Sequence, residues 1–267
     1  MVRAMTGTRS DTRPESRFET TSFGFREVAR EDKQGLVRDV FDRSARRYDL
    51  MNDLMSLGIH RVWKDIVITR ASPRPGERLI DVAGGTGDLA RAFLDRAKTR
   101  SPRGGGAPAE AVVADINYEM MRAGRRRGEA QGLDWVCANA EHLPFADASA
   151  DCVIIGFGIR NVTDRAAALS EMRRVLKPGG RFLCLEFSRP VNRAIGRVYD
   201  AWSFNAIPEL GRLIAKDRDS YQYLVESIRR FPHQEAFAAE MEAAGFSNVK
   251  VQNLSGGIAA LHTGWTL

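Results

Sequence analysis

Residues Leu79–Asp88 read LIDVAGGTGD, and the architecture of the chain follows from them. Three of the first four residues are apolar, as in a buried strand, and a glycine-rich turn then leads into a helical pattern. Glycines have no Cβ atom, so backbone N–H groups and a helix N-terminus can approach a ligand closely in such a turn. The spacing Gly85-x-Gly87-x-x-Ala90 also fits the dinucleotide-binding fingerprint, so the glycines alone do not distinguish between cofactors.

Outward from this turn, strand-like and helix-like segments alternate. Strands are predicted at 78–83, 111–115, 134–138, 151–157 and 180–187, with helices at 86–99, 117–131 and 164–176. This alternation indicates a mostly parallel sheet covered on both faces. A later helix at 233–244 is followed by strands near 247–253 and 258–264, which we expect to add an antiparallel edge. The prediction is an α/β, Rossmann-like fold with a seven-stranded sheet.

The same patterns divide the chain into segments. Residues 1–30 are polar and aperiodic, so we predict a disordered N-terminus followed by one domain over 31–267. Within it we expect an N-terminal helical cap at 31–76, containing a helix at 59–70, and a cofactor-binding core at 77–190. A helical insert at 191–230 and a C-terminal helix with strands at 231–267 complete the prediction.

Composition excludes several protein classes. With 267 residues, 43% of them hydrophobic, the chain can bury a full core. Its apolar runs are shorter than the roughly 20 residues of a bilayer-spanning helix. The net charge of +6 comes from scattered arginines, which favours a solvated surface over a nucleic-acid partner. The four histidines lack paired ligand spacing, so no metal site is expected. The three cysteines lie in apolar runs and are interpreted as buried reduced thiols: Cys137, Cys152 and Cys184.

Two carboxylates favour S-adenosylmethionine as the cofactor. Asp81 ends the strand before the glycine turn, where it would repel a pyrophosphate but suit a cationic ligand with an amino group. Asp115 ends the second strand and is expected to accept both ribose hydroxyls; the alternative is an N-cap for the helix that starts near Asn117. The polar segment 139–141 after the third strand is positioned to read an adenine amino group. The alternative for the glycines is an ordinary tight turn.

Several longer motifs identify a family. The most specific is YDLMNDLMSLGIHRVW at 48–63. Others are NAE at 139–141, LPF at 143–145, FGIRNVT at 157–163, RVLKPGG at 174–180, LEFS at 185–188 and YLVESI at 223–228. From about Phe23 to its C-terminus, the chain closely resembles the ubiquinone/menaquinone biosynthesis C-methyltransferases, the UbiE family.

This resemblance implies a class I methyltransferase fold and transfer of a methyl group from S-adenosylmethionine to a ring carbon of a polyprenylated benzoquinol or naphthoquinol. Ala83 departs from the wider superfamily, which often has a glycine there, and Gly156 stands where some relatives place a serine that bonds the cofactor. From the residues and the resemblance together, the predicted cofactor-binding set is Asp81, Gly85, Thr86, Gly87, Asp115, Asn139, Ala140 and Gly156.

The expected chemistry assigns roles to four further residues. A ring carbon becomes a good nucleophile only when the neighbouring hydroxyl ionises, and the fixed charge of Arg160 is expected to lower the quinol pKa. Asn161 is expected to orient the hydroxyl or a water. Tyr48 and His60 are candidates to relay the proton. The alternatives are a salt bridge for Arg160, a buried lid tyrosine for Tyr48 and a helix-start residue for His60.

The expected surroundings follow from the substrate. In the 192–230 segment, Tyr199, Trp202, Phe204 and Ile207 are interpreted as a cover that admits an isoprenoid tail, with plain core packing as the alternative. We expect peripheral attachment to the inner face of a bacterial membrane, or to the inner membrane from the mitochondrial matrix, beside other quinone-biosynthesis enzymes.

Other functions stay open from sequence. They are a methyltransferase acting on RNA or on another small molecule, and a non-catalytic scaffold of a quinone-biosynthesis complex. The sequence chooses neither between the two quinol rings nor between a monomer and a homodimer.

Overall fold

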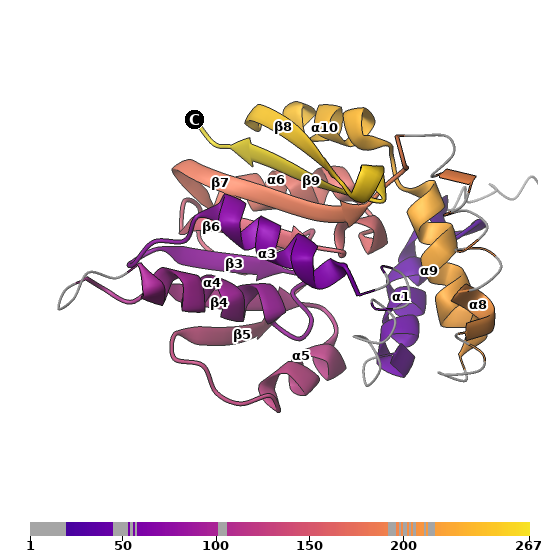
Figure 1. Cartoon of the computed structure of the whole chain (residues 1–267), viewed down its shortest axis with the longest axis horizontal. Helices are drawn as coiled ribbons and strands as arrows, with labels where there is room; N and C mark the ends of the chain where they lie inside the picture. Colours follow the sequence, from indigo (N-terminus) through magenta and orange to yellow (C-terminus); the bar gives the residue numbers. More distant parts are fainter. Residues whose placement is uncertain are drawn as a thin grey trace, which may run out of the picture.

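The structure, a computed structural model, describes residues 20–44, 53, 56, 58–100, 106–191, 196–197, 199, 202, 204, 207–210, 212 and 217–267. Its centre is a seven-stranded sheet in the order β5-β4-β3-β6-β7-β9-β8 (Figure 1). The strands are β3 Arg78–Val82, β4 Glu110–Asp115, β5 Leu133–Cys137, β6 Ala150–Gly156, β7 Leu176–Phe187, β8 Ser247–Leu254 and β9 Ala259–Trp265.

The predicted topology is confirmed. Strands β3 to β7 pair in parallel, and β9 pairs antiparallel with both β7 and β8. Strand β9 therefore lies inside the sheet, and β8 forms the edge. The parallel strands all end on the same side, so the loops that follow them meet there, which is where ligands bind in open α/β sheets.

Helices cover both faces of the sheet. They are α3 His60–Ala71, α4 Asp88–Thr99, α5 Tyr118–Arg125, α6 Arg165–Val175 and α10 Gln234–Ala243. Strand residues alternate between two cores: Leu79 packs in the cluster with α3 and α4, whereas Ile80 packs in the cluster with α6 and α10. Because alternate residues face opposite sides of the sheet and both sides are covered, the central strands are apolar throughout. Helix α5 ends at Arg125 and not at 131, and Gly128 three residues later has φ +106°.

Beyond the carboxyl ends of the strands lies a separate helical group, formed by α1 Arg30–Ser44, α8 Ile207–Leu210 and α9 Arg218–Arg230 (Figure 1). A hairpin of β1 Thr20–Phe23 and β2 Arg26–Ala29 precedes α1. The prediction of disorder through residue 30 is therefore wrong for residues 20–29. Their order depends on a distant partner, because the Phe23 ring stacks on Tyr223 with 4.2 Å between centroids.

The three cysteines are free, but only two are buried. Cys152 and Cys184 lie in the central strands β6 and β7, as predicted. Cys137 is exposed, so its predicted burial is wrong. It ends β5, which pairs on one side only, with β4, and is therefore an edge strand.

Candidate active site

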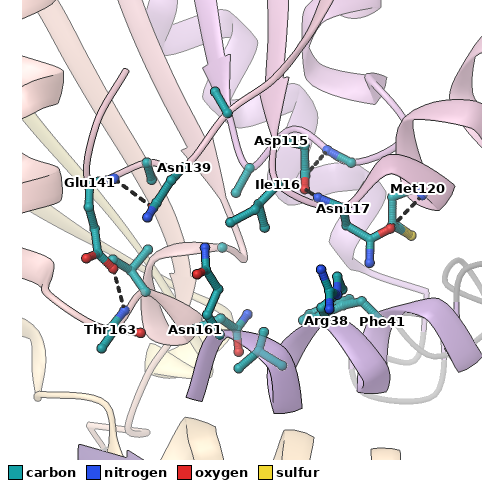
Figure 2. A pocket seen from close by; sticks show the side chains of 18 of the residues that line it. Arg38, Phe41, Asp115, Ile116, Asn117, Met120, Asn139, Glu141, Asn161 and Thr163 are labelled. Atoms are coloured by element: carbon teal, nitrogen blue, oxygen red, sulfur yellow. Dashed lines mark hydrogen bonds between the residues drawn. The ribbon is translucent and has the colours of Figure 1, made fainter. Parts of the chain in front are cut away.

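A pocket opens at the carboxyl ends of β3 to β6 and is covered by α1 (Figure 2). The sheet contributes residues at or directly after the ends of four strands: Ala83, Asp115, Ala138 and Phe157. Helix α1 contributes Gln34, Val37, Arg38 and Phe41 from the opposite side. The cofactor-binding core and the N-terminal cap therefore enclose this pocket together.

The glycine turn between β3 and α4 has positive φ angles, which favour glycine. Gly85 has φ +55° and Gly87, which caps α4, has φ +74°. A Cβ atom on Gly87 would lie 2.8 Å from the Trp135 ring, closer than real contacts permit. Gly85 lines the pocket, and the buried Thr86 bonds Asp88 through its hydroxyl at 3.2 Å. The turn thus brings backbone close to the pocket, as the sequence predicts.

Asp115, the last residue of β4, is hydrogen-bonded to the glycine turn that follows β3. Its Oδ2 accepts a hydrogen bond from Gly85 N at 2.8 Å, and its Oδ1 accepts one from Asn117 N at 2.7 Å. Burial raises the pKa of Asp115 to about 6. The N-cap of α5 is Asn117, whose Oδ1 accepts from Met120 N at 2.8 Å. Asp115 is therefore not the helix cap, and its carboxylate faces the pocket.

Asp81 lies beneath the glycine turn and is completely buried. Its Oδ2 accepts from Ala90 N at 3.1 Å, while its Oδ1 has no hydrogen-bond partner among the described residues. Burial raises the pKa of this carboxyl to about 7. A buried oxygen without a partner is uncommon in folded proteins and is typical of a site completed by a polar ligand or a water. Asp81 itself is not among the described residues that line the pocket.

The loop after β5 supplies the wall opposite Asp115. Asn139, Ala140 and Glu141 all line the pocket. The Asn139 Oδ1 accepts from Glu141 N at 3.0 Å, and Glu141 Oε1 accepts from Thr163 N at 3.0 Å (Figure 2). These bonds hold the β5 and β6 loops in a fixed arrangement across the pocket.

These groups fit S-adenosylmethionine. The glycine turn leaves room for a ligand against the backbone, Asp115 presents a carboxylate for two hydroxyls, and the buried Asp81 oxygen is free to receive a donor. Packing also explains the glycine at position 156. A Cβ atom on Gly156 would lie 2.7 Å from Leu89 Cδ1, so the close packing of α4 on β6 requires a glycine there.

The short helix η2 Ile159–Asn161 contains two predicted catalytic residues, whose side chains point in different directions. Asn161 lines the pocket and accepts a hydrogen bond from the Tyr223 hydroxyl at 3.0 Å. Arg160 points into the core, where its side chain is 2% exposed and its Nη1 donates to Glu186 Oε1 at 2.9 Å. The salt bridge considered from sequence is thus present. Arg160 is not among the described residues that line the pocket, and its catalytic role stays a prediction.

The other two predicted catalytic residues are Tyr48 and His60. Tyr48 lies outside the described residues. His60 begins α3, and its Nε2 lies 2.9 Å from Asp53 Oδ1. Burial lowers the pKa of His60, which favours the neutral ring. The structure therefore supports the helix-start interpretation, and His60 is not among the described pocket residues.

Sequence reasoning missed the contribution of α1. Its apolar residues Val37, Val40 and Phe41 recur at helical spacing, a signal of an amphipathic helix that gives no indication of what it covers. Two contacts fix its start to the pocket wall: an ion pair of Arg30 with Asp164, and a hydrogen bond from Lys33 Nζ to the Val162 carbonyl oxygen at 3.1 Å. Near its end, Asn117 Nδ2 donates to Asp42 Oδ1 at 2.8 Å.

The sheet topology and the glycine turn are those of the fold that S-adenosylmethionine-dependent methyltransferases share. One such enzyme from Thermotoga maritima superposes with a TM-score of 0.56 at 20% identity, covering 86% of this chain and 99% of that one. Another, from Aquifex aeolicus, gives 0.54 at 14% identity, over 76% and 89% of the two chains. These likenesses establish the fold.

Residues 26–266 match the model of the ubiE/COQ5 methyltransferase family, and the chain belongs to that family. The ubiquinone/menaquinone biosynthesis C-methyltransferase of Caulobacter vibrioides is 57% identical, over 93% of this chain and 98% of its own. The mitochondrial 2-methoxy-6-polyprenyl-1,4-benzoquinol methylase of Dictyostelium discoideum is 49% identical, over 92% and 86%.

Proposed function

We propose that this protein transfers a methyl group from S-adenosylmethionine to a ring carbon of a polyprenylated benzoquinol or naphthoquinol. The family and the names of the relatives support the reaction. The observation that carries the proposal is the pocket itself, which joins the glycine turn and Asp115 to an apolar wall with the Asn161 amide. A methyl donor and a flat apolar acceptor require such a combination in one enclosed space.

In this proposal the chain holds the cofactor through three strand ends. Asp115 accepts the ribose hydroxyls, the turn at Gly85 supports the amino-acid portion, and Asn139 with Ala140 forms the adenine wall. Bound there, the cofactor supplies an electrophilic methyl group. The ionised form of Asp115 is the better acceptor because a carboxylate presents lone pairs to both hydroxyls.

The remaining pocket residues act on the acceptor. Val37, Phe41, Phe157 and Val162 form apolar walls that exclude water and hold the ring near the methyl group. Such methyl transfer needs orientation and desolvation more than covalent help from the protein. The ring hydroxyl must ionise for its neighbouring carbon to react. In this proposal Asn161, a polar side chain of the same pocket, stabilises the oxygen formed.

The first experiment is a calorimetric titration with S-adenosylmethionine, comparing wild type with Asp115→Ala. Wild-type binding, weakened at least about tenfold in the variant, is expected from the loss of a charge-assisted acceptor. A short-tail demethylmenaquinol and a demethylated benzoquinol are then added, and a ring-methylated product is sought by mass spectrometry. Binding without either product would point to another acceptor, and the lack of any binding would favour a scaffold.

We also propose that the 191–230 insert covers the isoprenoid tail. Tyr199 is buried, and Trp202 and Phe204 pack against the larger core cluster. The Arg229 guanidinium lies 5.4 Å from the Phe204 ring centroid and 5.8 Å from that of Tyr199, so it supports both aromatic rings. Trp202→Ala is expected to weaken binding of long-tail quinols and leave tail-less quinols unchanged; equal effects would exclude the role.

Peripheral membrane attachment is the corresponding proposal for location. Within the described ranges, no helix is long and apolar enough to cross a bilayer. The tip of the hairpin exposes Phe25, which is 50% accessible, beside Arg26. Arg230 donates to the Phe25 carbonyl oxygen at 3.4 Å, and Glu226 accepts from the Phe25 N–H at 2.9 Å. An aromatic side chain among arginines suits an anionic lipid surface.

Flotation with phosphatidylglycerol vesicles tests this attachment. Phe25→Ser is expected to reduce the bound fraction, whereas Val62→Ser, at a similarly exposed position on α3, serves as the matched control. Equal binding of both variants and the wild type would rule out the hairpin tip as the attachment point.

A further inference from the structure

Tyr223 on α9 lies directly behind the pocket. Its hydroxyl donates to Asn161 Oδ1 at 3.0 Å, and its side chain is almost completely buried. Its ring stacks on Phe23 and belongs to a small apolar cluster with Val37 and Val40. Tyr223 is therefore fixed from the hairpin and from α1, and its only polar atom is directed at a residue of the pocket wall.

The direction of this hydrogen bond sets the orientation of the Asn161 amide. Burial raises the pKa of Tyr223, so the phenol keeps its proton and acts as a donor. Among the described residues, Asn161 Oδ1 is the acceptor that this proton has. Rotating the amide by half a turn would leave the phenol proton unpaired in a buried place, which is unfavourable by about 1–3 kcal/mol.

We propose that Tyr223 is a positioning residue that holds the Asn161 carbonyl oxygen, so that the Asn161 NH2 group faces the acceptor oxygen of the quinol. The inference rests on the proposed function and assigns this side chain a role through Asn161 only. An amide fixed in this way is a pure donor toward the substrate, which stabilises the oxyanion next to the reacting carbon. A freely rotating amide would present its carbonyl oxygen part of the time and repel that charge.

The arrangement also couples the pocket to the N-terminal segment. Val37 both lines the pocket and packs in the cluster that contains Tyr223, and Phe23 covers the other side of the phenol ring. The hairpin and α1 thus hold the donor of the Tyr223–Asn161 bond. Packing of this segment against the site thereby supports the orientation of the Asn161 amide.

Tyr223→Phe tests the proposal because it removes one oxygen and keeps the ring that stacks on Phe23. We expect kcat on a short-tail demethylquinol to fall about 10- to 100-fold, with KM and the affinity for S-adenosylmethionine changed less than about threefold. The rising limb of the pH profile of kcat is expected to move to higher pH. Tyr221→Phe, which removes another buried hydroxyl from the same helix, is the matched control and is expected to keep wild-type kinetics.

A double-mutant cycle separates positioning from a structural role. If Tyr223 acts through Asn161, Tyr223→Phe has no further effect on kcat in an Asn161→Ala background; additive losses overturn the proposal. Asn161→Asp tests the amide orientation without changing Tyr223, and also serves if Tyr223→Phe does not fold. Retained activity of Asn161→Asp would show that an oxygen faces the substrate and would overturn the proposal.

The wild-type measurement separates this inference from the proposed function. A wild-type enzyme that methylates neither quinol overturns the proposed function and the inference with it. A wild-type enzyme that methylates a quinol, with a Tyr223→Phe variant of equal kcat, overturns only the positioning role.

Discussion

Lys33 on α1 donates a hydrogen bond to the carbonyl oxygen of Val162, a residue of the pocket wall, at 3.1 Å. The Arg30–Asp164 ion pair lies at the same end of α1, and the Asp42–Asn117 hydrogen bond lies near the other. The helix is therefore attached to two of the loops that form the pocket. Because Val37 and Phe41 between these attachments line the cavity, the attachments determine how tightly the pocket is closed.

The buried amine of Lys33 predicts a pH-dependent stability. Burial and the nearby Arg165 and Arg30 lower the pKa of Lys33 to about 8, against the opposing effect of Glu141. Below that pH both the folded and the unfolded chain hold the proton. Between about pH 8 and 10.5 only the unfolded chain keeps it, so the free energy of unfolding rises with pH. Lys33→Met is expected to lose this rise, on the order of 2 kcal/mol between about pH 7.5 and 9.5.

Chemical denaturation at these two pH values measures the effect. Lys98→Met removes an amine from an exposed position of α4 and is the control. The comparison of each variant with wild type cancels the titration of all other groups. An identical pH dependence in Lys33→Met and wild type would contradict the burial of the charge.

The raised pKa of Asp115 predicts that cofactor affinity depends on pH. In the folded chain the Asp115 carboxyl is protonated below about pH 6, whereas in the unfolded chain it is protonated only below about 3.8. The contribution of Asp115 to the free energy of unfolding is therefore fully present below pH 3.8 and is lost as the pH rises through 6. The ionised form binds the ribose better, so affinity for S-adenosylmethionine should fall about tenfold per pH unit below 6. Asp115→Asn should lose this part of the pH dependence of cofactor affinity. It should keep the part that comes from Asp81, whose pKa is about 7.

Calorimetric titrations at several pH values measure this dependence. Asp134→Asn, an exposed carboxylate on the neighbouring strand β5, is expected to bind like wild type at every pH. A wild-type affinity that is constant between about pH 5 and 7 would contradict the assignment of Asp115 as the ionisable ribose acceptor.

Much of the fold follows from local patterns in the sequence. The central strands are buried on both faces, so their apolar runs and the glycine turn after Val82 mark them without knowledge of the tertiary structure. The same reasoning places Asp115 and Asn139 on the side of the sheet where the carboxyl ends of the parallel strands meet. The structure brings both to one pocket, together with Asn161.

What the sequence did not reveal depends on contacts between distant segments. The hairpin at 20–29 is ordered through a ring at Tyr223, and Arg160 finds its partner in Glu186, on the neighbouring strand β7. Local periodicity contains no information on either pair. For the same reason, the amphipathic pattern of α1 predicts a helix but does not predict that Val37 and Phe41 cover the cofactor pocket.

The Arg160–Glu186 pair offers a test of the predicted catalytic role. Glu186→Ala leaves a buried guanidinium without its carboxylate and is expected to lower the free energy of unfolding by about 3–5 kcal/mol. The double variant Arg160→Met with Glu186→Leu replaces both charges and is expected to regain most of this stability. Denaturant unfolding of the three proteins measures the difference, and a Glu186→Ala variant as stable as wild type would contradict a buried ion pair.

The activity of the same double variant distinguishes the two interpretations of Arg160. If its charge lowers the quinol pKa, a stable double variant stays at least about tenfold slower than wild type. If Arg160 serves only the core, the double variant recovers activity together with its stability.

Substitution of Gly124 in α5 is expected to disturb the cofactor site, although Gly124 is not among the described residues that line the pocket. A Cβ atom at Gly124 would lie 2.6 Å from the Thr86 carbonyl oxygen and 2.5 Å from the Trp135 ring, so Gly124→Ala must displace the glycine turn. We expect a loss of about 1–3 kcal/mol in stability and a clear fall in calorimetric affinity for S-adenosylmethionine. Gly35→Ala is the matched control in α1: nothing lies within 4 Å of its Cβ, and the better helix propensity of alanine should stabilise the chain by up to about 1 kcal/mol. Equal cofactor affinity in the two variants would show that the packing of α5 does not hold the turn in place.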